Sequence, residues 1–235
     1  MQFARLSSIT SSPIVGNKNT VRQNYSVTNS FDEIHVNGVI DYQLLQRADY
    51  PKEELIVETD SNLQDYIVIN IKNAHILNIG LNTSFIYQQP LKIIVHVTFR
   101  QLNKLQVDGT GSVQSINPMR QSNNSEFVLI KKGTGNLHLI LDIFRFQADL
   151  SGTGHIRLRG RVEQAASIVQ SGVTSLDARD FLCKKMDIHS SGVSTAYVTV
   201  TDEINAEAIG LAKIYYKGNL NRKQIDGQSA IITPY

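Results

Sequence analysis

Gly152-Thr153-Gly154, Ser171-Gly172-Val173 and Ser191-Gly192-Val193 are three copies of a short glycine-centred motif that recurs about every 20 residues. Related copies lie on either side, at Gly109-Thr110-Gly111, Gly133-Thr134-Gly135 and Ile209-Gly210-Leu211, with a weaker one at Gly227. Among the six clear copies, the first glycines are 24, 19, 20, 20 and 18 residues apart. A nearly fixed period of this length with strand-like flanks is typical of a solenoid in which each repeat forms one coil.

The residues around each glycine alternate between apolar and polar. Around Gly152, for example, apolar side chains occur six and four positions before it (Phe146, Ala148) and four and six positions after it (Ile156, Leu158). A period of two is what a strand with one buried face requires. Because equivalent positions recur in every coil, we expect continuous ladders of side chains inside. The sequence therefore predicts an all-β fold, a β-helix of parallel strands in coils of roughly 20 residues.

The chain is predicted to form one domain with three parts. Residues 1–28 are rich in Ser, Thr and Asn and are predicted to be an irregular N-terminal tail. Residues 29–100 contain strand-like alternation, clearest over residues 91–97, and form the N-terminal β segment of the same domain. Residues 101–232 carry the glycine-punctuated repeats, and a loop inserted at residues 117–124 explains the 24-residue step.

Composition narrows the possible functions. Hydrophobic residues make up 41% and charged residues 19%, and the formal net charge is +2. A net charge this close to zero argues against bulk electrostatic binding to nucleic acid or an anionic membrane. No segment approaches the roughly 20 apolar residues of a transmembrane helix, and the first ten residues lack the unbroken apolar stretch of a secretory signal. Cys183, the single cysteine, is interpreted as a buried thiol.

Motifs for catalysis, metal or cofactor binding are not found. His138, His155 and His189 lie at different offsets from their glycines and are not expected to converge on one ion. The Gly-x-Gly motifs lack the third glycine, the lysine and the following helix of a phosphate-binding loop. Asp177 and Asp180 have no acidic neighbours at matching offsets, so no carboxylate ladder for polysaccharide cleavage is predicted.

One outward-facing stripe is a candidate binding surface. Five residues after the glycines come Gln114, His138, Arg157, Asp177, Tyr197, Tyr215 and Ile232. Arg157 should form an ion pair with Asp177 on the next coil, and Tyr197 should stack on Tyr215.

Two positions further along each coil, Arg159 and Arg179 should also be neighbours. Such like charges require a compensating acid, for which Asp180 is available, or an anionic ligand. Tyrosines beside arginines suit sugars or acidic glycans, whereas the alternative is an ordinary solvated face. The candidate ligand face consists of Arg157, Arg159, Asp177, Arg179, Tyr197 and Tyr215.

Three stretches also carry a family resemblance. They are Phe31-Asp32-Glu33-Ile34-His35-Val36-Asn37-Gly38 with the strand that follows it to Leu44, residues 102–111, and the ending Ile214-Tyr215-Tyr216-Lys217-Gly218-Asn219. With the glycine repeats between them, residues 29–232 resemble the auto-transporter adhesin head domain family, also called the head GIN domain family. The resemblance implies a β-helical, non-catalytic surface or secreted protein, and it brings no catalytic or ligand residues with it.

Three functions remain open from the sequence. The first is a non-enzymatic binding module, adhesin-like and located on the cell surface or secreted, with a glycan or another cell-surface component as partner. The second is an intracellular scaffold that assembles end to end, because an open β-helix end exposes unpaired strand edges. The third is a polysaccharide-cleaving β-helix enzyme. For the binding module, no cofactor, metal or nucleic-acid partner is expected.

Overall fold

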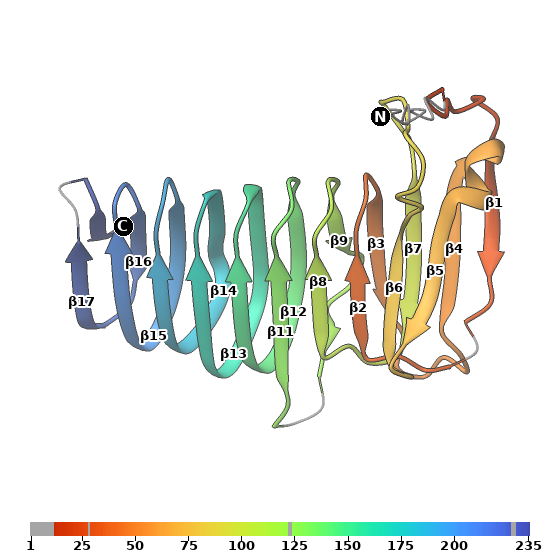
Figure 1. Ribbon diagram of the computed structural model, residues 1–235. Coiled ribbons are helices and arrows are strands. Elements are labelled where there is room, and N and C mark those ends of the chain that lie inside the picture. The colour runs from red at the N-terminus through yellow and green to blue at the C-terminus, as the bar shows by residue number, and fades with distance from the viewer. Residues whose placement is uncertain (1–11, 28, 122–123, 227–228) are drawn as a thin grey trace, which may run out of the picture.

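The computed structural model describes residues 12–27, 29–121, 124–226 and 229–235 of the chain. These residues form an elongated β-solenoid whose coils follow one another along a single axis (Figure 1). The predicted all-β fold and the coils of about 20 residues are confirmed.

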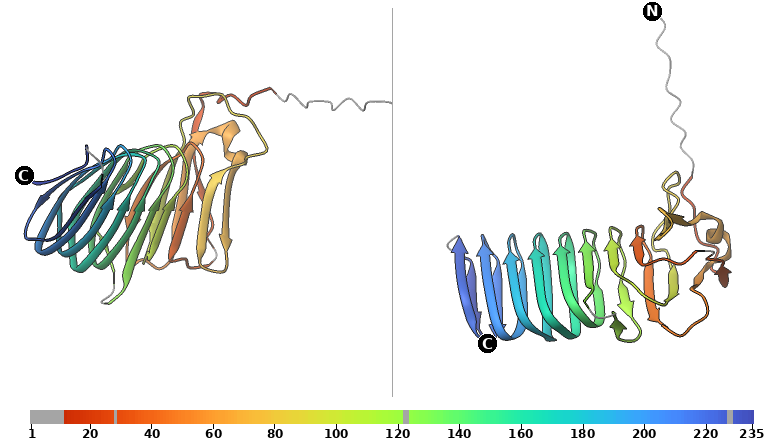
Figure 2. Two further views of the ribbon diagram at one scale, coloured as in Figure 1. Left: turned by 60° about the vertical axis from the view of Figure 1, so that its left-hand side comes forward. Right: turned by 90° about the horizontal axis from the view of Figure 1, so that it is seen from below.

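Each coil contributes a strand to two walls that face each other across the core (Figures 1 and 2). The first wall starts with β1 (Thr20–Tyr25), β4 (Glu54–Asp60), β7 (Ile94–Phe99), β3 (Asp41–Gln46) and β9 (Val113–Ser115). The second wall starts with β5 (Ile67–Lys72), β6 (Ile76–Leu81), β2 (Glu33–Val36), β8 (Lys104–Val107) and β11 (Glu126–Lys131). A 3-10 helix, η1 (Ser61–Tyr66), joins β4 to β5.

Four long strands then bend around the corner between the walls and belong to both. They are β12 (Leu137–Leu150), β13 (Thr153–Gln170), β14 (Val173–Ser190) and β15 (Thr195–Ile209). The first half of β12 pairs with β9 and its second half with β11, which shows how one strand serves both walls. The solenoid ends with β16 (Lys213–Lys217) and β18 (Ile231–Pro234) on the first wall and β17 (Leu220–Asp226) on the second. The short β10 (Met119–Arg120) lies beside β12 in the inserted segment.

The predicted interior ladders are present. Four positions before the glycines, the side chains of Leu105, Leu129, Ala148, Ile168, Ile188 and Ala206 are each at most 3% exposed. At the corners the backbones of successive coils are hydrogen-bonded, as in Val173 N to Gly152 O (2.9 Å) and Val193 N to Gly172 O (2.9 Å). The glycine repeat thus marks the corner where successive coils contact each other through backbone.

The first coils differ from the predicted all-parallel arrangement. β1 with β4, β4 with β7, and β5 with β6 pair antiparallel, whereas the pairs from β2 and β3 onward are parallel. The chain reverses between β5 and β6 at Asn73 and Ala74, whose φ angles of 50° and 63° are those of a tight hairpin turn. Alternation of apolar and polar residues is the same in both directions, so the pattern alone did not distinguish them.

Two further expectations are corrected. Residues 20–25, within the segment predicted to be irregular, form β1 and pair with β4; residues 1–11 and 28 of that segment lie outside the described residues. In the last coil, Ile232 is buried (3% exposed) and Ile231 is not (37%). Ile214 pairs with Ile232 and Tyr215 with Thr233, so Thr233 takes the outward position that counting from Gly227 gave to Ile232.

Polar groups inside the solenoid are satisfied by backbone oxygens near the corners. The Lys131 side chain is 2% exposed, and its Nζ donates to the carbonyls of Gly133 (2.8 Å) and Thr153 (3.0 Å). Two coils further along the same ladder, Gln170 is fully buried, and its side-chain amide donates to Thr174 O and Thr195 O. Burial lowers the pKa of Lys131. These bonds compensate for desolvation of the polar groups, so they point to a structural role.

Cys183 is buried, as predicted, with 1% exposure. Burial raises the pKa of its thiol to about 11, and Sγ donates to Lys185 O (2.7 Å). Since the thiolate is the reactive form, we expect a thiol reagent at about pH 8 to leave the folded protein unlabelled and to label one thiol after denaturation. Mass spectrometry of labelled protein measures this, and rapid labelling of the folded protein would contradict it.

Candidate ligand-binding face

The outward stripe of the first wall is built by strand register. Gln114 pairs with His138, His138 with Arg157, Arg157 with Asp177, Asp177 with Tyr197, and Tyr197 with Tyr215. These residues lie on successive strands and follow the same number of positions after their corner glycines. Since side chains alternate across a strand, all of them face away from the core. The predicted row, apart from Ile232, is therefore present, and its role as a ligand face remains a proposal.

Asp177 is held between two arginines. Arg179 donates to it through both Nε (2.8 Å, to Oδ1) and Nη2 (2.9 Å, to Oδ2), and Arg157 Nε lies 3.7 Å from Oδ2. The Arg179 hydrogen bond is the largest cause that lowers the pKa of Asp177. The carboxylate therefore stays ionised, and it fixes the Arg179 guanidinium in a bidentate geometry. The predicted Arg157–Asp177 ion pair is confirmed.

The predicted Arg159–Arg179 neighbourhood is wrong. The register between β13 and β14 shifts by one residue after Arg157, so that Arg159 pairs with Asp180. Arg159 Nε lies 3.8 Å from Asp180 Oδ2, which makes Asp180 the compensating acid. Arg179 turns back toward Asp177. A β-bulge of this kind inserts a residue in one strand only, and it separates like charges that a strict period would place together.

Tyr197 stacks on Tyr215 as predicted, with ring centroids 4.8 Å apart and an interplanar angle of 11°. The guanidinium carbon of Arg179 lies 5.3 Å from the Tyr197 ring centroid. The Tyr197 ring is thus contacted both by Tyr215, on the next coil, and by Arg179, on the preceding coil. A stacked ring with a cation over it is a rigid arrangement that loses little freedom on binding a ligand.

Tyr235 belongs to this cluster and was missed in the sequence analysis. Its ring meets Tyr197 edge to face, with centroids 5.9 Å apart, and its hydroxyl is 3.0 Å from Thr199 Oγ1. It is 50% exposed, so it offers more open aromatic surface than the stacked pair. Counting the alternation onward from Ile232, rather than from Gly227, would have placed it on the outer face.

The histidines are distributed over the molecule. His138 lies in the stripe, where burial and then the charges of Arg159 and Arg157 lower its pKa, which favours the neutral ring. His189 lies on the second wall, with Nδ1 2.6 Å from Glu207 Oε2. Within the described ranges, no three or more His, Cys, Asp or Glu side chains are grouped so that they could hold a metal ion. None of the helical segments described has the length and apolar character of a membrane span.

Solved structures from Bacteroides and Parabacteroides have the same fold. A "putative adhesin" from Bacteroides fragilis is 23% identical with a TM-score of 0.85, covering 94% of this chain and 100% of that one. A "putative lipid binding protein" and a "putative adhesin", both from Parabacteroides distasonis, are each 22% identical, with TM-scores of 0.75 and 0.66; each match covers 95% of this chain and 100% of the other. At these identities the similarity shows the fold.

The search of curated proteins gave no match. A family model described as "Putative auto-transporter adhesin, head GIN domain" matches residues 30–219, which include all strands from β2 to β16. This agrees with the resemblance found in residues 29–232, and the chain belongs to the head GIN domain family.

Proposed function

We propose that the protein is a non-enzymatic, adhesin-like binding module of the cell surface or of the secreted fraction, and that it binds a glycan through the outward stripe of its first wall. The observation that carries the proposal is the Tyr197–Tyr215 stack with Arg179 against it. Membership of the head GIN domain family supports the adhesin-like part. We assign to the candidate ligand face Arg157, Arg159, Asp177, Arg179, Tyr197 and Tyr215, as predicted from the sequence, and add Tyr235.

The geometry determines how a sugar would contact this face. Tyr215 and Arg179 lie against the Tyr197 ring, so a ligand meets the ring edges and hydroxyls of the stacked tyrosines. Tyr235, half exposed, supplies open aromatic surface for the apolar side of a sugar ring. Arg157 and Arg159, whose side chains are 46% and 41% exposed, supply hydrogen-bond donors nearby.

Two observations support a non-enzymatic role. A glycosidase requires a general acid whose pKa is raised, whereas the pKa of Asp177 is lowered by Arg179. Asp180, the carboxylate beside this face, lies 3.8 Å from Arg159, and its side chain is 67% exposed. Neither carboxylate therefore lies in the apolar surroundings that a general acid of glycoside hydrolysis requires.

A double substitution tests the proposed face. Tyr197→Ala with Tyr215→Ala should abolish the binding that the unmodified protein shows on a glycan array, because both the stacked pair and the support for Arg179 are lost. The melting temperature should change little, since both rings lie on the outer surface. Tyr50→Ala is a matched control, because Tyr50 also has an arginine over its ring, Arg47 at 5.2 Å. Undiminished glycan binding by the double variant would remove the stripe from consideration.

A further inference from the structure

A groove runs beside the candidate ligand face on the first wall. It consists of three adjoining hollows of about 360, 450 and 320 Å³ that share lining residues. Pro118 and Arg120 line both the first and the second, and Arg161 and Leu182 line both the second and the third. We call it the axial groove, and its defining residues are Arg120, Asp142, Gly160, Arg161, Leu182 and Lys184.

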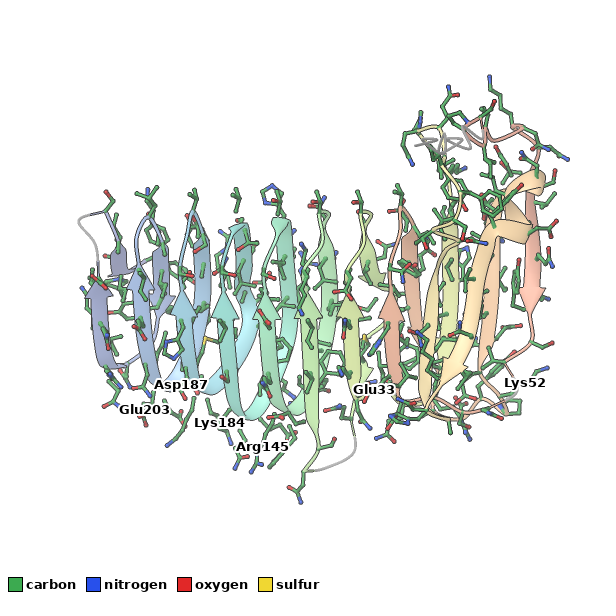
Figure 3. All side chains as sticks on the ribbon, in the orientation of Figure 1. Glu33, Lys52, Arg145, Lys184, Asp187 and Glu203 are labelled. Carbon is green, nitrogen blue, oxygen red and sulfur yellow. The ribbon has the colours of Figure 1, made fainter. Side chains whose placement is uncertain are left out.

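Strand register aligns the axial groove with the solenoid axis. Arg120 pairs with Asp142, Asp142 with Arg161, Arg161 with Leu182, and Leu182 with Thr199. Four steps between neighbouring strands correspond to about 19 Å. Lys184 projects from the edge where β14 turns from the first wall to the second (Figure 3). A ligand that fills the groove would therefore be an extended chain lying across several coils.

The floor of the groove is open and partly apolar. Gly160 has a φ of 104°, and a Cβ there would lie 2.0 Å from Leu141 O, so the position holds no side chain. On the next strand Leu182 is 49% exposed, because three residues of β14, 179–181, have no counterpart in β15 and the register shifts there. An exposed leucine beside a bare backbone offers a surface for the apolar side of a sugar ring.

The groove carries more positive than negative charge. Asp142 is shared by two arginines, at 3.3 Å from Arg120 Nε and 2.7 Å from Arg161 Nε. The arginine side chains are 68% and 63% exposed, and Asp142 is 26% exposed. Lys184 is exposed, and its side chain makes no hydrogen bond or ion pair with a described residue. Glu163 Oε1 lies 4.0 Å from Arg161 Nη2. Because both arginines use Nε on Asp142, the carboxylate fixes their position and leaves terminal donors toward solvent.

We propose that the axial groove binds an anionic polysaccharide, extended along the solenoid axis, with its acidic groups on Arg120, Arg161 and Lys184 and a sugar ring on Leu182. Pre-positioned guanidinium groups bind carboxylate or sulfate through parallel N–H donors. The proposal rests on the proposed glycan-binding function and specifies its ligand class. The groove adjoins the stripe, since Ile140 in the groove pairs with Arg159 and Thr199 at its end contacts Tyr235.

The test measures the affinity of the protein for three oligosaccharide series of increasing length by calorimetry. Oligogalacturonates carry carboxylates, heparin fragments carry sulfates, and dextran oligosaccharides are neutral. We expect the unmodified protein to prefer one of the acidic series and to bind longer chains more tightly. Arg120→Gln with Arg161→Gln should weaken this binding by about tenfold or more, since charge-assisted hydrogen bonds are lost. Arg222→Gln with Lys223→Gln on β17 removes the same charge from the second wall and should change binding less than about twofold.

The outcomes separate this inference from the proposed function. Equal losses in both double variants would overturn the groove, because binding would then follow overall charge. The protein could instead bind dextran through Tyr197 and Tyr215 and show no preference for either acidic series. That result would overturn the groove proposal and leave the proposed function in place. Absence of binding to all three series and to the glycan array would overturn both. Melting temperatures of the variants verify that each remains folded.

Discussion

The Ile188→Asp variant is expected to lose several kcal/mol of unfolding free energy, because it places a carboxylate in the dry interior. Ile188 is fully buried and pairs with Ile168 on one side and Ala206 on the other, both of them interior ladder positions. Both neighbours are apolar, so the new carboxylate would have no ion-pair partner beside it. Ile156 is 1% exposed in the interior ladder of the first wall, where it pairs with Leu176, and Ile156→Asp should have the same effect.

Val169→Asp is the control for this substitution. Val169 directly follows Ile168, the ladder neighbour of Ile188, but its side chain points outward and is 47% exposed. Its replacement should change stability by about 0.5 kcal/mol or less, as surface substitutions do. Chemical denaturation followed by circular dichroism compares the two variants. An Ile188→Asp protein as stable as the Val169→Asp protein would show that the interior register is wrong.

Gly172→Ala should be far more destabilising than Gly210→Ala, although the two glycines have nearly the same φ angle. Their φ angles are 76° and 75°, so both variants incur the cost of a left-handed alanine, about 1–2 kcal/mol. They differ in the space around the new methyl group. At Gly172 a Cβ would lie 2.5 Å from Gly152 O, and at Gly210 the nearest atom, Gly192 O, is 4.0 Å away.

The additional cost at Gly172 comes from backbone that cannot move aside as a side chain can. Relieving the contact would separate two coils at the corner where Val173 N donates to Gly152 O. We expect Gly172→Ala to lose several kcal/mol in total, by analogy with other overpacking substitutions. Thermal and denaturant unfolding of both variants measures the difference. Equal stabilities would mean that successive coils are not in close backbone contact at these corners.

The glycine period predicted the fold and the neighbours in the near part of the candidate ligand face, because the register is constant close to each corner. From Gly172 to Asp177, and from Gly192 to Tyr197, no bulge intervenes, so counting gave the correct neighbours. Beyond that point it failed for Arg159 and Arg179. A bulge changes the number of residues between two positions without changing which residues are apolar, so the sequence carries little sign of it.

Two features were missed for a different reason: the axial groove, and the antiparallel cap in which β1 pairs with β4, β4 with β7, and β5 with β6. Strand direction in the cap is set by how the chain reverses at η1 and at the Asn73–Ala74 turn, and alternation does not report direction. The groove combines residues at unequal distances from their glycines, such as Arg120 from the inserted segment and Leu182 beyond a bulge. Only the three-dimensional register brings them into one row.

The change from antiparallel to parallel pairing after the first coils has a consequence for how such a protein can grow. The antiparallel cap fits only at the first coils, whereas β12 to β15 pair in parallel with neighbours of their own kind. Duplication of one repeat in the middle would therefore add a coil without altering the cap or the closing strands. Each added coil would lengthen the outer rows by one residue, about 4.8 Å. The length of the candidate ligand face can in this way change in steps of one coil, through duplication of a single repeat in the gene.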